Sequence, residues 1–167
     1  MTKFNKILIA NRGEIAVRII RTCKDMGIRT AAVFSQADTD ALHVKLADEI
    51  YEIGPPEAAE SYLNFEKIVH VAKQSGADAI HPGYGFLSEN PEFVELCERE
   101  KIIFIGPSSS CMFKAKPKNR ARQLMRMINI PVTPGCDDAI TNGTAEGTRR
   151  AREIAAEVGY PVIVKPS

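Results

Sequence analysis

The first 106 residues alternate short apolar runs with amphipathic segments, a pattern typical of repeated strand–helix units. Residues 6–10 (KILIA) form a continuous apolar run. Such a run is expected for a strand that is covered on both faces. Similar runs predict four more strands, at residues 29–34, 49–53, 77–80 and 102–105.

Helical periodicity separates these runs. The spacing of apolar residues predicts a helix over 14–26, ended by Gly27 as a left-handed cap. A second helix is expected to begin after a cap at Asn64 and to end at Gly76. Asn90-Pro91-Glu92 predicts a third helix start, because it combines a cap, a proline at the first helical position and an acid in the first turn. This order of elements predicts a Rossmann-like α/β fold, in which a parallel sheet lies between two layers of helices.

After Pro107 the pattern changes. Residues 114–128 are basic, with apolar positions spaced for an amphipathic helix, and a turn-rich connector follows. A further helix is predicted over 145–158, and residues 160–165 (YPVIVK) predict the start of another strand. We therefore expect one complete domain and the incomplete beginning of a second, with bounds of 1–113 and 114–167.

Composition excludes several classes of protein. Hydrophobic residues make up 44% of the chain and charged residues 26%, and the net charge of +1 gives no general attraction to nucleic acid. No apolar run is long enough to span a bilayer, and no signal peptide is apparent, so a cytoplasmic location is expected. Neither the cysteines nor the histidines have metal-ligand spacing, and the scattered cysteines do not suggest disulfides. Cys23 and Cys97 are interpreted as core residues, and His43 and His70 as ordinary helix residues.

The segment 10–15 (ANRGEI) lies at a predicted strand-to-helix turn, where free backbone N–H groups can hold an anion. Its spacing is not G-x-G-x-x-G, since Asn11 and Arg12 occupy places where a dinucleotide-binding turn requires small residues. The alternative is a purely structural tight turn with Gly13 near the helix start.

The segment 81–90 (HPGYGFLSEN) is the most informative stretch. It follows the fourth strand at its carboxyl end, which is the edge where open α/β sheets bind ligands. Gly83 and Gly85 flank Tyr84, so the backbone can approach a ligand while the tyrosine offers a ring and a hydroxyl. The alternative is an ordinary connecting loop, in which Glu89 does no more than favour the helix start.

Lys118 and Lys165 are the remaining candidate site residues. A lysine provides a point charge for phosphate, although most lysines are solvated surface residues. Lys165 is the stronger candidate, because an apolar run leads directly into it.

Four segments together resemble the biotin carboxylase family, in that family's order and spacing over nearly the whole chain. They are KILIANRGEIAVRIIRTCKDMGI, the stretch from His43 to Asp48, IHPGYGFLSEN and FIGPS. The resemblance implies that residues 1–113 form the amino-terminal domain that precedes the ATP-grasp region of these enzymes. Residues 114–167 would be the connector and the truncated start of the ATP-grasp region.

The resemblance also implies a function. The family uses ATP and bicarbonate to carboxylate biotin on a carrier protein, the first half-reaction of enzymes such as acetyl-CoA carboxylase of fatty acid biosynthesis, and a carboxyltransferase completes the reaction. Lys118 and Lys165 would face ATP, and Tyr84 and Gly85 would lie near biotin. Three charged residues of the first helix would contribute to a homodimer contact or, alternatively, form a solvated face: Arg18, Arg21 and Asp25.

One segment departs from the family pattern, because residues 115–117 (AKP) replace the usual Met-Gly-Asp before the lysine that corresponds to Lys118. By contrast, PVIVK matches the family at Lys165. The family's glycine-rich loop, its Mg²⁺ ligands and its catalytic base and arginine would lie beyond Ser167. We therefore expect no catalytic or metal-binding residue within the chain, and no activity from it alone.

The sequence leaves two other functions as alternatives. A non-catalytic module for subunit contact is compatible with the resemblance. A nicotinamide-dependent oxidoreductase is disfavoured by the missing glycine motif, and by Ser35 at the place where an acid should end the second strand.

Overall fold

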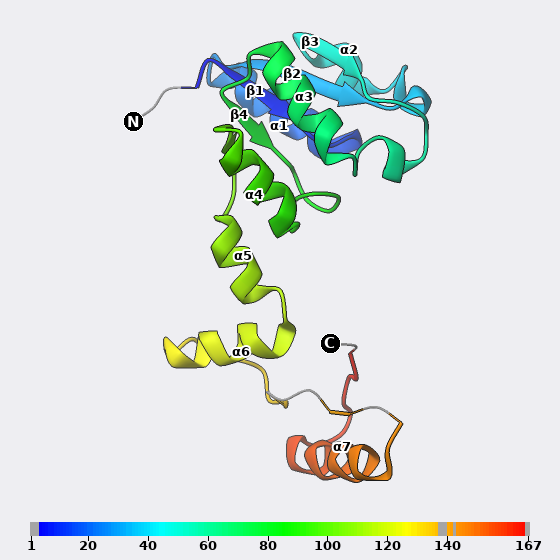
Figure 1. Ribbon diagram of the computed structural model, residues 1–167, viewed down its shortest axis with the longest axis vertical. Coiled ribbons are helices and arrows are strands. Elements are labelled where there is room, and N and C mark those ends of the chain that lie inside the picture. The colour runs from blue at the N-terminus through cyan, green and yellow to red at the C-terminus, as the bar shows by residue number, and fades with distance from the viewer. Residues whose placement is uncertain (1–3, 137–139, 142, 166–167) are drawn as a thin grey trace. The chain divides into compact units, whose positions relative to one another are not determined.

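The computed structural model describes residues 4–136, 140–141 and 143–165. The chain divides into two compact units, Met1–Met112 and Phe113–Ser167 (Figure 1). This division falls one residue before the boundary predicted from the sequence.

A five-stranded sheet forms the centre of the first unit. All its strand pairs are parallel, and the strand order is β3-β2-β1-β4-β5. In the central strand, Leu8 pairs with Ala31 on one side and Ile80 on the other. The predicted parallel sheet is confirmed, and its strands are β1 (Lys6–Ile9), β2 (Arg29–Phe34), β3 (Glu49–Glu52), β4 (Ala79–His81) and β5 (Ile103–Phe104).

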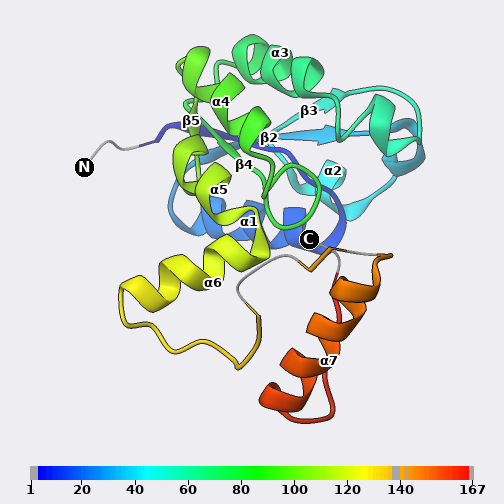
Figure 2. The same ribbon diagram turned by 60° about the horizontal axis from the view of Figure 1, so that its bottom comes forward.

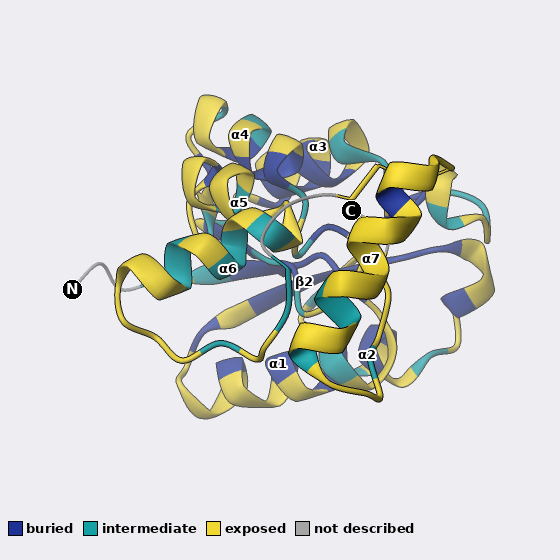
Figure 3. Ribbon diagram, turned by 90° about the horizontal axis from the view of Figure 1, so that it is seen from below, coloured by how far each residue is buried: buried dark blue, intermediate teal, exposed yellow. Residues whose placement is uncertain are grey.

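Helices cover both faces of this sheet, as predicted. Figures 1 and 2 show α1 (Gly13–Asp25) and α2 (Leu42–Leu46) on one face, and α3 (Phe65–Ser75) and α4 (Pro91–Arg99) on the other. Two short 3₁₀ helices, Gln36–Asp38 and Ala58–Glu60, lie in the connections. Each face has its own apolar core, and the inner sides of α1, α3 and α4 are buried (Figure 3). The arrangement is the expected three-layer α/β fold.

The predicted helix ends are explained by local hydrogen bonds. The side-chain oxygen of Asn64 accepts a hydrogen bond from the backbone N–H of Lys67 at 3.0 Å, and Asn90 caps α4 in the same way. Gly76 ends α3 in the left-handed conformation, with φ of 65°. These contacts satisfy backbone groups that a helix end leaves without a partner.

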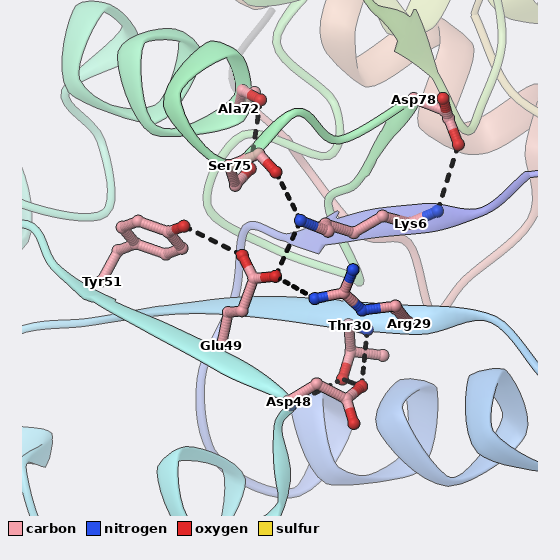
Figure 4. A network of polar contacts seen from close by, with 9 residues as sticks. All are labelled: Lys6, Arg29, Thr30, Asp48, Glu49, Tyr51, Ala72, Ser75 and Asp78. Carbon is pink, nitrogen blue, oxygen red and sulfur yellow. Dashed lines mark hydrogen bonds and ion pairs between the residues drawn. The ribbon is translucent and has the colours of Figure 1, made fainter.

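A polar network closes the amino-terminal edge of the sheet (Figure 4). The ammonium group of Lys6 pairs with the Glu49 carboxylate at 2.7 Å and donates to the backbone oxygen of Ser75 at 2.5 Å. The same carboxylate pairs with Arg29 and accepts a hydrogen bond from the Tyr51 hydroxyl at 2.9 Å. The hydrogen bond from Lys6 lowers the pKa of Glu49, so the carboxylate stays charged and joins β1, β2 and β3.

Two further carboxylates extend this network. Asp48 accepts hydrogen bonds from the backbone N–H and the hydroxyl of Thr30, each at 2.8 Å. Asp78 accepts from the backbone N–H groups of Asn5 at 2.6 Å and Lys6 at 3.1 Å. This edge is therefore occupied by contacts that hold the strands in register.

The second unit is helical in the residues that the structure describes. Its helices are α6 (Lys118–Met127) and α7 (Ala145–Val158), and α5 (Ser109–Ala115) crosses the division between the units. The predicted single helix over 114–128 is therefore wrong in extent. Pro117 caps α6 with an extended backbone, φ −70° and ψ 122°, and this conformation separates α5 from α6. The helix predicted over 145–158 is confirmed, with Thr144 as its cap.

The strand predicted over 160–165 is not formed. These residues follow α7 without regular secondary structure, and Ile163 and Val164 are 84% and 91% exposed. A strand requires the N–H and C=O groups of a neighbouring strand as partners, and residues 113–136, 140–141 and 143–165 contain none. Residues 160–165 thus have the apolar pattern of a strand but no neighbouring strand among the described residues of this unit.

We expect Phe93→Ala to lower the free energy of unfolding of the chain by about 3–5 kcal/mol, measured by urea denaturation. The Phe93 side chain is fully buried, and its ring centroid lies 5.5 Å from that of Phe65 and 6.1 Å from that of Phe104. Ile103→Ala is the control. Because Ile103 is 47% exposed, this variant should lose clearly less free energy of unfolding. Equal losses in the two variants would contradict the description of this core.

Candidate functional site

The strand order places the candidate site at the point where the chain reverses direction across the sheet. β1 and β4 are neighbours, and β1 leads to α1 on one face whereas β4 leads to α4 on the other. In such sheets ligands bind outside the carboxyl ends of the strands, at the point where the connections leave for opposite faces. The turn 10–12 and the loop 82–90 follow β1 and β4, and they are joined by hydrogen bonds at this edge.

Asn11 joins these two loops. Its side-chain nitrogen donates hydrogen bonds to the backbone oxygens of Pro82 at 2.7 Å and Tyr84 at 2.8 Å. Its side-chain oxygen accepts from the N–H of Arg12 at 2.8 Å, and the residue is only 3% exposed. No binding or positioning role of Asn11 is predicted from the sequence. A short amide directly after an apolar strand was the available signal, but its partners lie about 70 residues away.

The backbone of the loop is shaped by its glycines. Gly83 and Gly85 have φ of 65° and 66°, a backbone conformation that residues other than glycine rarely adopt. A Cβ atom on Gly83 would lie 2.9 Å from the Asn11 side-chain nitrogen and 3.1 Å from Cγ1 of Ile15. Gly83 also donates its N–H to Nδ1 of His81 at 3.1 Å. The backbone approaches the β1–α1 turn as closely as glycine allows.

Tyr84 lies at the surface of this loop. It is 61% exposed, and its hydroxyl donates a hydrogen bond to the Glu14 carboxylate. This contact raises the pKa of Tyr84. The ring is not enclosed by neighbouring helices, so an exposed aromatic face and a glycine backbone lie side by side at the ligand edge of the sheet.

A second polar cluster lies beside the loop, at the end of β2. The Tyr62 hydroxyl donates to the Asp38 carboxylate at 2.7 Å and accepts from the N–H of Ser35 at 3.0 Å. The Arg12 guanidinium lies 2.9 Å from the same carboxylate. Burial, reinforced by the hydrogen bond to Asp38, raises the pKa of Tyr62 to about 12. The Phe86 ring stacks on Tyr62 with centroids 5.2 Å apart, so the cluster also supports the loop.

These contacts weigh against a dinucleotide site. Ser35 is buried at the end of β2 and donates its hydroxyl to Asp38 at 2.9 Å, so its position does not offer a carboxylate to a ribose. The N–H of Arg12 is already bonded to Asn11. The N–H of Arg12 therefore serves the turn itself, as the structural interpretation of residues 10–15 predicts.

His43 differs from its interpretation as an ordinary helix residue. It is fully buried, and its Nε2 lies 3.3 Å from the backbone oxygen of Val33. Its Nδ1 has no hydrogen-bond partner among the described residues. Burial lowers the pKa of His43, so the folded protein holds it neutral. This burial could not be predicted from the sequence, because α2 has only five residues and little periodicity.

The other predicted site residues lie on separate elements. Arg18, Arg21 and Asp25 are exposed on α1, at spacings that place them along one face. Lys118 is the exposed first residue of α6, and Lys165 lies exposed in the segment after α7. Both lysines belong to the second unit.

The residues that the structure describes contain no group of three or more His, Cys, Asp or Glu side chains arranged to hold a metal ion. Among them, no helix has the length and apolar character needed to cross a membrane.

These features define a doubly wound α/β domain with its ligand edge between β1 and β4. Residues 3–112 match the family described as biotin carboxylase, N-terminal domain. The chain therefore belongs to the biotin carboxylase family. Residues 117–167 match a second family, the ATP-binding domain of the carbamoyl-phosphate synthase L chain.

Curated relatives agree with this assignment. The chain is 53% identical to biotin carboxylase 1 of Bacillus subtilis over 160 residues, which cover 96% of the chain and 34% of that protein. It is 51% identical to the mitochondrial methylcrotonoyl-CoA carboxylase subunit alpha of Mus musculus, covering 96% of the chain and 22% of the relative. The chain thus spans about a third or less of the length of these relatives.

A solved structure supports the fold. A biotin carboxylase from Campylobacter jejuni, in a complex with β-γ-ATP, is 48% identical and superimposes with a TM-score of 0.84. The match covers 95% of this chain and 34% of the Campylobacter chain. The Rossmann-like α/β class predicted from the sequence is confirmed.

We expect the stability of the protein to fall as the pH drops below about 6.5, because burial lowers the pKa values of His43 and His81. The unfolded chain then binds protons that the folded chain excludes. The stabilisation is complete above the unfolded pKa and is lost toward the folded pKa. The limiting slope is about 1.4 kcal/mol per pH unit for each histidine.

Urea denaturation between pH 7.5 and 5 measures this dependence. His43→Gln should make the slope shallower, whereas His70→Gln should leave it unchanged, since His70 is exposed on α3. Identical slopes in the original protein and the His43 variant would rule out its contribution.

Proposed function

We propose that this chain is the amino-terminal part of a biotin carboxylase, an ATP-dependent ligase that uses bicarbonate to carboxylate biotin on a carrier protein. The observation that carries the proposal is the loop 82–90, which leaves Tyr84 exposed at the ligand edge of the sheet. Membership of the biotin carboxylase family supports it.

In this proposal the first unit contributes to the biotin site. Tyr84 offers an aromatic face and Gly85 an accessible backbone, and together they suit a flat heterocycle such as the ureido ring of biotin. No side-chain atom would lie within 4 Å of a Cβ on Gly85, so the space beside it is open. In this proposal both residues bind and orient the ring.

The second unit contributes to the ATP site. Lys118 and Lys165 are proposed to face the nucleotide, where each ammonium group would offset phosphate charge. Pro117 is the cap at which α6 begins, so it determines where Lys118 lies. It belongs to residues 115–117, the segment that departs from the family pattern. A related biotin carboxylase domain is described as a complex with MgADP, ADP and bicarbonate, which supports a nucleotide site that also takes Mg²⁺. The metal ligands are proposed to lie in the rest of a longer protein, as the resemblance to the biotin carboxylase family implies.

The proposed partners follow from the half-reaction. A biotin carrier protein or domain brings the substrate, and a carboxyltransferase uses the carboxylated product. Acetyl-CoA is one candidate acceptor, with a role in fatty acid biosynthesis. Relatives named methylcrotonoyl-CoA carboxylase and pyruvate carboxylase show that the family serves several acceptors. A cytoplasmic location stays a prediction.

A subunit-contact role is the second candidate. It is favoured by the exposed charged face of α1, formed by Arg18, Arg21 and Asp25. The structure of a related biotin carboxylase domain is described as a dimer. The two functions are compatible, since a catalytic domain can also carry the dimer contact.

We expect a longer protein that contains this chain to hydrolyse ATP only when both bicarbonate and biotin are present. The 167 residues alone should show no such activity, because phosphoryl transfer requires metal-assisted charge stabilisation. Phosphate release with and without each substrate measures both expectations. An inactive longer protein would contradict the proposed reaction, and activity in the 167 residues would contradict the missing metal site.

We expect Arg21→Glu in the longer protein to shift its oligomeric state from dimer toward monomer, measured by analytical ultracentrifugation. The substitution places a negative charge beside Asp25 on the exposed face of α1. Arg99→Glu is a matched control, because Arg99 is exposed on α4 at the opposite face of the sheet. Unchanged sedimentation of both variants would show that α1 is not part of the dimer contact.

A further inference from the structure

The Asn11 carboxamide is the central link between the β1–α1 turn and the loop that carries Tyr84. Both of its N–H bonds point at backbone oxygens of that loop, at 2.7 Å for Pro82 and 2.8 Å for Tyr84. The side chain is buried, so water cannot readily replace these bonds. Holding the oxygens on either side of Gly83 fixes the backbone that leads into Tyr84.

The same turn holds the loop at two further points. Gly83 packs against the Asn11 side chain so closely that a Cβ would lie 2.9 Å from its nitrogen. Glu14 accepts the hydrogen bond from the Tyr84 hydroxyl. The turn therefore restrains the loop backbone and the tyrosine ring together, whereas Gly85 has free space beside it.

We propose that Asn11 is a positioning residue for biotin: through its two donated hydrogen bonds, it holds Tyr84 and Gly85 where the ureido ring binds. This inference rests on the proposed function. Asn11 does not itself touch the substrate in this proposal. It acts through the loop, so its loss should weaken the binding of biotin and leave the binding of ATP intact.

The proposal can be tested by removing the two hydrogen-bond donors of Asn11. Asn11→Asp keeps the size and shape of the side chain but replaces its two N–H donors with an oxygen. That oxygen would face two carbonyl oxygens and repel them. A displaced loop should weaken the binding of biotin, so we expect the KM for free biotin to rise about tenfold or more. The KM for ATP should stay within about twofold.

Asn64→Asp is the matched control for this substitution. Asn64 uses its side-chain oxygen to accept a hydrogen bond at the start of α3, a role that a carboxylate keeps. The same chemical change should therefore leave both KM values unchanged. Steady-state kinetics of bicarbonate- and biotin-dependent ATP hydrolysis, measured on the longer protein, compares the two variants.

A second pair of variants tests the same contact from the side of the loop. Gly83→Ala inserts a Cβ against Asn11 and should also raise the KM for biotin. Gly76→Ala creates the same backbone strain, since Gly76 has φ of 65°, but its Cβ would meet nothing within 4 Å. It should leave the KM for biotin unchanged. This pair decides the question if Asn11→Asp does not fold.

Hydrogen exchange provides a readout that does not depend on activity. In Asn11→Asp, the amides of residues 83–88 should exchange about tenfold faster than in the original longer protein, and Asn64→Asp should not change them. An active original enzyme with unchanged KM for biotin in Asn11→Asp and Gly83→Ala would overturn the positioning role. An original enzyme that lacks biotin-dependent ATP hydrolysis would instead overturn the proposed function, and the biotin role of Asn11 with it.

Discussion

The candidate site depends on one buried side chain, the amide of Asn11, which bonds two loops across the centre of the sheet. A loop with two glycines in the left-handed region is costly to order, because glycine loses much conformational freedom on folding. The two donated hydrogen bonds and the packing of Gly83 offset this cost. The loop can then present an exposed tyrosine in a defined place without burying its ring.

The two edges of the sheet serve different purposes. At the amino-terminal edge, Lys6 and Glu49 belong to a network of ion pairs and hydrogen bonds that ties three strands together (Figure 4). At the carboxyl edge, the end of β2 is filled by Tyr62 and Asp38, whereas Tyr84 lies exposed in the loop that follows β4. Ionic contacts that fix register thus lie away from the edge where a substrate would bind.

Much of the first unit could be predicted from the sequence because its signals are local. Apolar runs of four to six residues mark β1 and β2, and Asn64 and Asn90 cap helices through bonds to residues only three positions away. The second unit was predicted less well. The apolar run before Lys165 has the pattern of a strand, but pairing requires a neighbour that the local sequence does not provide.

By itself, then, the sequence determined the α/β class, the order of elements and the loop that carries Tyr84, since these depend on periodicity, capping and short motifs. Only the tertiary structure decided that Asn11 holds this loop, that Tyr62 and Asp38 fill the end of β2, and that His43 is buried. Those contacts join residues 10 to 73 positions apart. Such pairs come together only when strands from distant segments align side by side, so no local pattern records them.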